Sequence, residues 1–127
     1  MQHDKLADCL AVIKNGENVG KRSCETPKSK LVNSVLEVMK NEKYIGEIND
    51  VDDDKHKKNI ELLGRINDCN VIKPRFPVKS DNFEKWEMRY LPARGFGILI
   101  VSTPHGVMAH TEAKKKEIGG KLLAYVY

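Results

Sequence analysis

A strand-forming apolar run that stops at a polar loop is the feature that most constrains the fold of this chain. Residues 98–101 are all aliphatic. They are followed directly by Ser102, Thr103, Pro104, His105 and Gly106. The aliphatic run predicts a strand buried on both faces, and the hydroxyls, proline and glycine predict an exposed turn. A core strand must therefore present a short polar loop, and hydroxyls and backbone amides there suit phosphates, sugar hydroxyls and base edges.

The charge distribution indicates that the partner of this loop is RNA. Lysine and arginine total 22 against 18 acidic residues, a formal net charge of +4. Four of the acidic residues gather at 50–54, whereas basic residues stand at Lys28, Lys30, Lys73, Arg75, Arg89, Arg94 and 114–116. Such asymmetry fits a polyanion-binding face with an acidic tip held away from it. Composition alone is equally typical of a soluble protein with mixed surface charge.

Other classes of protein are disfavoured. The sequence has no apolar run of about eighteen residues and no signal-peptide core at its start, so we expect a cytoplasmic protein without membrane contact. Cys9, Cys24 and Cys69 are odd in number and have no paired spacing, which favours reduced, buried thiols over disulfides or zinc. No glycine-rich phosphate loop is present, and we expect no cofactor and no small-molecule substrate.

Residues 1–65 predict an N-terminal α/β domain of order αβαββ. Apolar residues spaced at i, i+3, i+4 and i+7 from Leu6 predict a first helix, which Asn15 and Gly16 should end. A second helix has its apolar stripe over 31–39 and takes Ser29, or Thr26 with Pro27, as its cap. Strands are expected over 19–25, 44–51 and 59–64, the last two forming a hairpin.

Residues 66–127 predict a second domain that is mostly β with one short helix. The fold class is therefore α+β, with two small domains. Strands are expected over 71–73, 87–90, 96–101 and 122–127. The aromatic residues of the loop after the first strand are assigned to the core rather than to base stacking; they are Phe76, Phe83 and Trp86.

The short helix of this second half should follow the polar loop. Thr111 is its expected cap, and it should run to Glu117 and end at Gly119 and Gly120.

Two rival sites fail on their own chemistry. Asp50, Asp52, Asp54 and Glu61 match the spacing of an EF-hand calcium loop, but Lys55 stands where the turn needs glycine, and strands flank it instead of helices. A Ser102–His105 couple lacks the strained nucleophile elbow and the orienting carboxylate of a serine hydrolase. We therefore expect neither catalytic residues nor a metal site.

Two basic segments point to anion binding. Lys30 lies in the first turn of the second helix, where the helix dipole disfavours a cation by about 0.3 to 1 kcal/mol unless an anion binds there. Lys114 and Lys121 are close in sequence to Ser102 and Gly106, so one patch could clamp phosphates. By itself the lysine run at 114–116 is better explained as a solvated helix face.

Several motifs in register resemble the archaeal and eukaryotic form of the universal small-subunit ribosomal protein family number eight. They are the segments 43–47, 73–78, 89–94, 98–108 and 119–127. The resemblance implies two small domains that bind the central domain of small-subunit ribosomal RNA. Pro104 and His105 occupy variable positions of the family's loop, and the start of the chain lacks the family's Asp-Pro pair, which puts RNA contacts from the first few residues in doubt.

The resemblance also implies which residues contact RNA. The family's loop lies in the minor groove of an irregular helix with displaced bases, and it matches Ser102, Thr103 and Gly106. The end of the first helix matches Lys14 and Asn15, the start of the second matches Ser29 and Lys30, and the C-terminal element matches Gly119, Gly120 and Lys121.

The interpretation that follows is a non-enzymatic RNA-binding protein of the small ribosomal subunit. It would promote ribosomal RNA folding beside neighbouring ribosomal proteins. The expected RNA-binding residues are Lys14, Asn15, Ser29, Lys30, Ser102, Thr103, Pro104, His105, Gly106, Lys114, Gly119, Gly120 and Lys121. The alternative is a basic protein-interaction module outside the ribosome.

Overall fold

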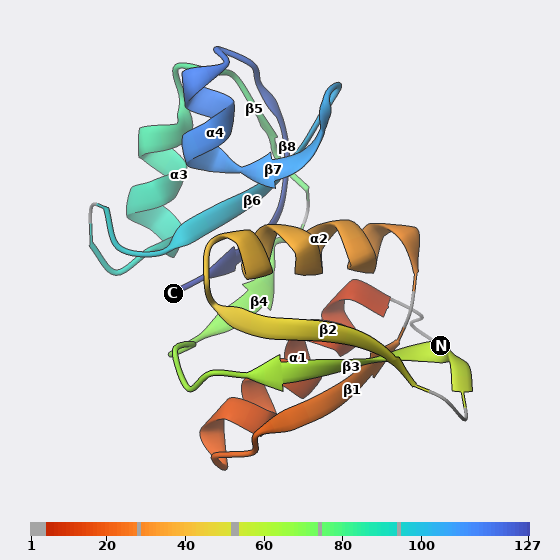
Figure 1. Ribbon diagram of the computed structural model, residues 1–127. Coiled ribbons are helices and arrows are strands. Elements are labelled where there is room, and N and C mark those ends of the chain that lie inside the picture. The colour runs from red at the N-terminus through yellow and green to blue at the C-terminus, as the bar shows by residue number, and fades with distance from the viewer. Residues whose placement is uncertain (1–4, 28, 52–53, 74, 94) are drawn as a thin grey trace. The chain divides into compact units, whose positions relative to one another are not determined.

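The computed structural model describes residues 5–27, 29–51, 54–73, 75–93 and 95–127, without the side chains of 54–56 (Figure 1). The chain forms two compact units, Met1–Asp68 and Cys69–Tyr127. Both contain helices and antiparallel sheet, so the α+β prediction is confirmed. No helix in the described ranges is long and apolar enough to cross a membrane.

The first unit has the predicted order αβαββ. Its elements are α1 (Lys5–Asn18), β1 (Ser23–Pro27), α2 (Lys30–Asn41), β2 (Ile45–Val51) and β3 (Asp54–Leu62). The strands form an antiparallel sheet of order β1-β3-β2. α1 packs against β1, β3 and α2, and α2 packs against β2. The core consists of the apolar stripes of both helices with Ile45, Ile60 and Leu62 from the sheet.

The ends of the two helices have identifiable local causes. Ser29, one of the two predicted caps, is the N-cap of α2, because its Oγ accepts a hydrogen bond from the backbone N–H of Val32 at 3.1 Å. The predicted end of α1 at Asn15 and Gly16 is wrong. The helix continues to Asn18 and is terminated by Gly20 just beyond it. The φ of +73° at Gly20 lets the last carbonyls of the helix accept hydrogen bonds from the following amides.

Gly16 is instead an interior residue of α1, and its lack of a side chain permits close packing. A Cβ placed on it would lie 2.8 Å from Cδ1 of Leu62, so the glycine lets β3 approach the helix.

The second unit has β8 at the centre of its sheet. Its elements are β4 (Cys69–Val71), β5 (Pro77–Val78), α3 (Phe83–Tyr90), β6 (Ile98–Thr103), β7 (Gly106–Ala109), α4 (His110–Lys115) and β8 (Gly120–Val126). The sheet order is β4-β8-β6-β7, and β5 also pairs with β8. Both helices contribute to one core cluster with Leu99, Val101 and Leu122 from the sheet.

The second unit therefore contains two helices where the sequence predicts one. The strand expected over 87–90 is wrong, because these residues form the second half of α3. Phe83, Trp86 and Glu87 are buried at the i, i+3, i+4 spacing of a helix, and the helix is stable because this face packs on the sheet.

α4 also differs at both ends from the prediction. It begins at His110, with Ala109 as the N-cap residue, and Thr111 does not cap it. At its other end the left-handed conformation falls on Glu117, with φ +56°, two residues before the glycines. The N–H of Ile118 then bonds to the carbonyl of Ala113, which closes the helix without a glycine.

Candidate nucleic-acid interface

The hairpin of β6 and β7 presents the polar loop to solvent. Thr103 pairs with Gly106 across a turn of two residues, Pro104 and His105, and the turn residues and Gly106 are exposed. Thr103 is nearly buried. Its Oγ1 donates to the Gly106 carbonyl at 2.7 Å and accepts from the His105 N–H at 3.1 Å. Gly106 has φ +112°, which few residues with a Cβ adopt.

Thr103 therefore fixes the shape of the loop from inside. Its hydroxyl is engaged in the turn rather than displayed on the surface. Sequence reasoning missed this role, although a threonine two residues before an amide in a turn is a recognised signal for it.

β8 brings two further candidates next to the loop. Ser102 of β6 lies between Lys121 of β8 and Val107 of β7 in the register of the sheet. Residues directly opposite one another on antiparallel strands share a face, so Ser102 and Lys121 point to the same side. Ser102 is half-buried, Lys121 is exposed, and within the described residues neither side chain has a hydrogen-bond or ion-pair partner.

Gly119 and Gly120 are required by close backbone packing. A Cβ on Gly119 would lie 2.3 Å from the Val78 carbonyl oxygen, and one on Gly120 would lie 2.1 Å from the Ser102 carbonyl oxygen. Neither contact is sterically allowed. The two glycines thus hold β8 against β5 and β6, and they position Lys121 beside Ser102.

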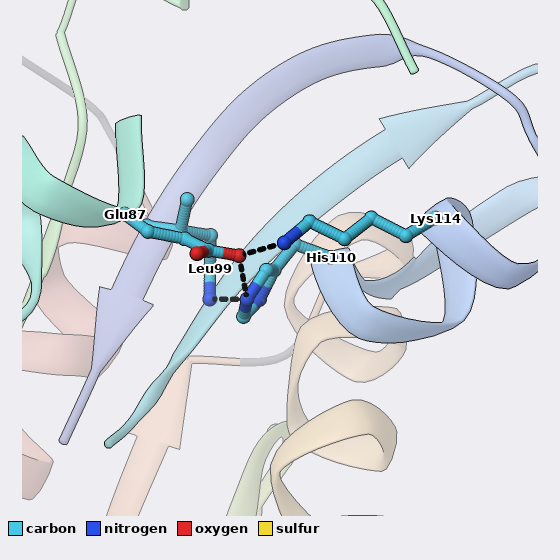
Figure 2. Close-up of polar contacts among 4 residues, drawn as sticks. All are labelled: Glu87, Leu99, His110 and Lys114. Carbon is cyan, nitrogen blue, oxygen red and sulfur yellow. Dashed lines mark hydrogen bonds and ion pairs between the residues drawn. The ribbon is translucent and has the colours of Figure 1, made fainter. Parts of the chain in front are cut away.

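Lys114, a predicted phosphate contact, takes part in a polar cluster inside the second unit (Figure 2). Its Nζ forms an ion pair with Oε1 of Glu87, a buried residue of α3. The same Oε1 lies 2.8 Å from Nε2 of His110, and the backbone N–H of Leu99 donates to Nδ1 of His110 at 3.0 Å. The cluster therefore joins α3, α4 and β6, and within it the charge of Lys114 is paired with the carboxylate of Glu87.

The hydrogen bonds in this cluster define the protonation of His110. Because Nδ1 accepts from an amide, it carries no proton, so the proton is on Nε2 and is donated to Glu87. Burial lowers the pKa of His110 below its ordinary 6.5; the neighbouring Lys114 charge lowers it further, against the opposing effect of Glu87. The neutral imidazole is the stable form at neutral pH.

The four candidates of the first unit do not form one patch. Lys14 is in an ion pair with Asp68 at 2.7 Å, and Asn15 is exposed one turn before the end of α1. Ser29 is occupied as the cap of α2, and Lys30 is exposed at its first residue. The end of α1 and the start of α2 lie at opposite ends of the five-residue strand β1, about 17 Å apart along it (Figure 1).

The described part of the chain contains no group of three or more histidine, cysteine or acidic residues placed to hold a metal ion. In the acidic hairpin, Asp50 forms an ion pair with Lys58 at 3.0 Å, and β2 and β3 flank the tip in place of helices. Asp52 of the calcium-loop pattern lies outside the described residues, as do Lys28 and Arg94 of the basic clusters.

Comparison with known proteins covers both units. The profile of the family described as Ribosomal protein S8 matches residues 4–127. The small ribosomal subunit protein uS8 of Methanococcoides burtonii is 50% identical over 126 residues, which cover 98% of this chain and 97% of that relative. Since the match extends over nearly the whole sequence, the chain belongs to the ribosomal protein S8 family.

Proposed function

We propose that the chain binds the central domain of small-subunit ribosomal RNA and stabilises its fold during subunit assembly. Membership of the ribosomal protein S8 family makes it a structural, non-enzymatic protein of the small ribosomal subunit. The proposal adds the RNA region, the contacting residues and the role in assembly. Neighbouring proteins of the small subunit are its expected protein partners.

The observation that carries this proposal is the surface formed by the β6–β7 loop with Ser102 and Lys121. Pro104 and His105 form an exposed turn whose shape is fixed by Thr103. Next to it, one hydroxyl and one ammonium share a face and have no partner among the described residues. A rigid protrusion with a donor–acceptor hydroxyl beside a cation suits the wide minor groove of RNA, with its 2′-hydroxyls and phosphates.

The two kinds of contact have different tasks. Lys121, and Lys30 in the first unit, would neutralise phosphates and supply salt-dependent affinity without sequence information. Ser102 and the loop would recognise the shape of an irregular helix. By neutralising backbone charge where strands crowd together, the protein would lower the free-energy cost of the native RNA fold.

The test compares a central-domain hairpin RNA with a regular duplex of equal length, over a series of salt concentrations. Ser102→Ala should weaken hairpin binding by about two- to tenfold, the value of one hydrogen bond, and leave duplex binding almost unchanged. Lys121→Ala should weaken both about equally and reduce the salt slope by about one. Lys57→Ala serves as the charge-matched control, since Lys57 is exposed in the first unit.

Two results would count against the proposal. Equal losses of Ser102→Ala on hairpin and duplex would show that the loop carries no shape recognition. Equal binding of the unmodified protein to both RNAs at every salt concentration would leave only non-specific attraction to a basic surface.

A further inference from the structure

Five aromatic rings form a continuous row in the second unit. The neighbouring pairs are Phe76–Trp86, Trp86–Tyr90, Tyr90–Tyr125 and Tyr125–Tyr127, with ring centroids 4.7, 6.4, 5.7 and 6.0 Å apart. All interplanar angles are 25° or less, so the rings are nearly parallel. Trp86 is buried within the row, but the other four rings are only half-buried and keep part of their surface in solvent.

Two cations of α3 lie over this row. The guanidinium of Arg89 is 5.5 Å from the ring centroid of Phe76, 5.6 Å from that of Trp86 and 5.7 Å from that of Tyr90. The ammonium of Lys85 is 5.3 Å from the ring of Trp86. Cations at these distances are attracted by the faces of the rings.

α3 separates this basic side from an acidic and apolar one. Lys85 and Arg89 are four residues apart and share a face of the helix, whereas Glu84 and Met88 line a depression on another. Among the residues that the structure describes, neither Lys85 nor Arg89 is in an ion pair with a carboxylate. Both cations are exposed and keep their N–H donors for a ligand.

We propose that this surface, Phe76, Tyr90, Lys85 and Arg89, binds an unpaired stretch of RNA. Phe76, at the end of the row with one ring neighbour, and the guanidinium plane of Arg89 offer surfaces on which bases stack, and Arg89 and Lys85 offer donors to the adjoining phosphates. The inference rests on the proposed function in taking RNA as the ligand. It adds a second site, which tolerates any base because every base has an aromatic face.

This second site lies on the opposite face of the sheet from Ser102 and Lys121. Val101 and Leu122 pair with each other and face the core that contains α3, and the next pair along the strands is Ser102 with Lys121. Successive residues of a strand point to opposite faces, so the loop surface is directed away from the aromatic row. One RNA that occupies both sites must pass around the edge of the unit.

Trp86 provides a direct readout, because it is the only tryptophan of the chain and lies inside the row. Titration of the full chain with a ten-nucleotide oligouridine, which has no stable secondary structure, should quench its fluorescence. Arg89→Gln should weaken this binding about tenfold, and Arg89→Lys should also weaken it, because an ammonium lacks the planar fork that lies flat on a ring. Lys115→Gln, on exposed α4, should change little and serves as the charge-matched control.

The controls separate this inference from the proposed function. Ser102→Ala should leave oligouridine binding unchanged, and Arg89→Gln should leave the preference for the hairpin over the duplex unchanged. Equal effects of Arg89→Gln and Lys115→Gln would overturn the second site. The second site would also be overturned if a polyglutamate peptide quenched the fluorescence of Trp86 as strongly as the RNA does, and if this quenching depended on Arg89 to the same extent. The surface would then select an acidic protein. Urea unfolding of each variant verifies that the fold is retained.

Discussion

Replacing Glu87 by alanine should destabilise the second unit by about 1 to 4 kcal/mol, because two donors share one oxygen of this carboxylate. His110 contributes most. Its side chain is 5% exposed, and its Nε2–H would lose its acceptor; an unsatisfied buried donor costs about 1 to 3 kcal/mol. The pair with Lys114 adds about 0 to 1 kcal/mol, since that lysine side chain is 38% exposed and screened by water.

Glu87→Gln is the matched variant. Glutamine keeps an acceptor oxygen for His110 and removes only the charge, so we expect a loss of about 1 kcal/mol or less. Urea unfolding followed by the fluorescence of Trp86 reports on the second unit directly, and an unchanged dependence on urea concentration identifies a true change in stability.

Two outcomes would refute this reasoning. If the alanine and glutamine variants lost the same stability, the charge of Glu87 would matter and its role as acceptor would not. If alanine cost less than about 1 kcal/mol, His110 would have no buried donor to satisfy.

Three further predictions concern single groups. Folding lowers the pKa of His110 below its ordinary value of 6.5, so in that pH region the unfolded chain binds more protons than the folded chain. The free energy of unfolding should therefore fall as the pH decreases through that region, and His110→Gln should lack this part of the pH dependence. Gly120→Ala, whose Cβ would lie 2.1 Å from the Ser102 carbonyl oxygen, should lower the free energy of unfolding, measured with urea, by about 1 to 3 kcal/mol or prevent folding. A free energy of unfolding like that of the unmodified protein would contradict the packing argument. Burial and the Glu17 charge raise the pKa of the Cys24 thiol from 9.0 to about 11, so alkylation of Cys24 in the folded protein, measured by mass spectrometry, should stay slow up to pH 9 and be much faster in urea.

The sequence was informative where local patterns and burial agree. The helices of the first unit, the strand at 98–101 and the Ser29 cap could be predicted because apolar spacing and capping chemistry point to the same structure. α3 was missed because eight residues are too few for a clear helical period, and its buried face was assigned to a loop. The helix depends on long-range packing that the sequence does not display.

The glycines show a second limit of sequence reasoning. Gly16 has the sequence context of a helix end, but the structure uses it for contact with Leu62, and Gly20 ends the helix. Similarly, the sequence predicts Thr103 as an RNA contact but does not reveal that its hydroxyl is engaged within the turn. A residue type can serve packing or function, and only its neighbours in the folded chain distinguish the two.

The central position of β8 has a consequence for synthesis of the chain. β4, β5 and β6 all pair with β8, and Cys69 at the start of the unit pairs with Val126 near its end. At about 5 to 20 residues per second, translation from Asp68 to the end of β8 takes roughly 3 to 12 seconds. During that interval the strands of the first unit are already complete, whereas the second unit has only a β6–β7 hairpin without its central strand. Emergence of the C-terminal segment therefore sets the earliest moment at which the surface proposed to bind RNA, the β6–β7 loop with Ser102 and Lys121, can be complete.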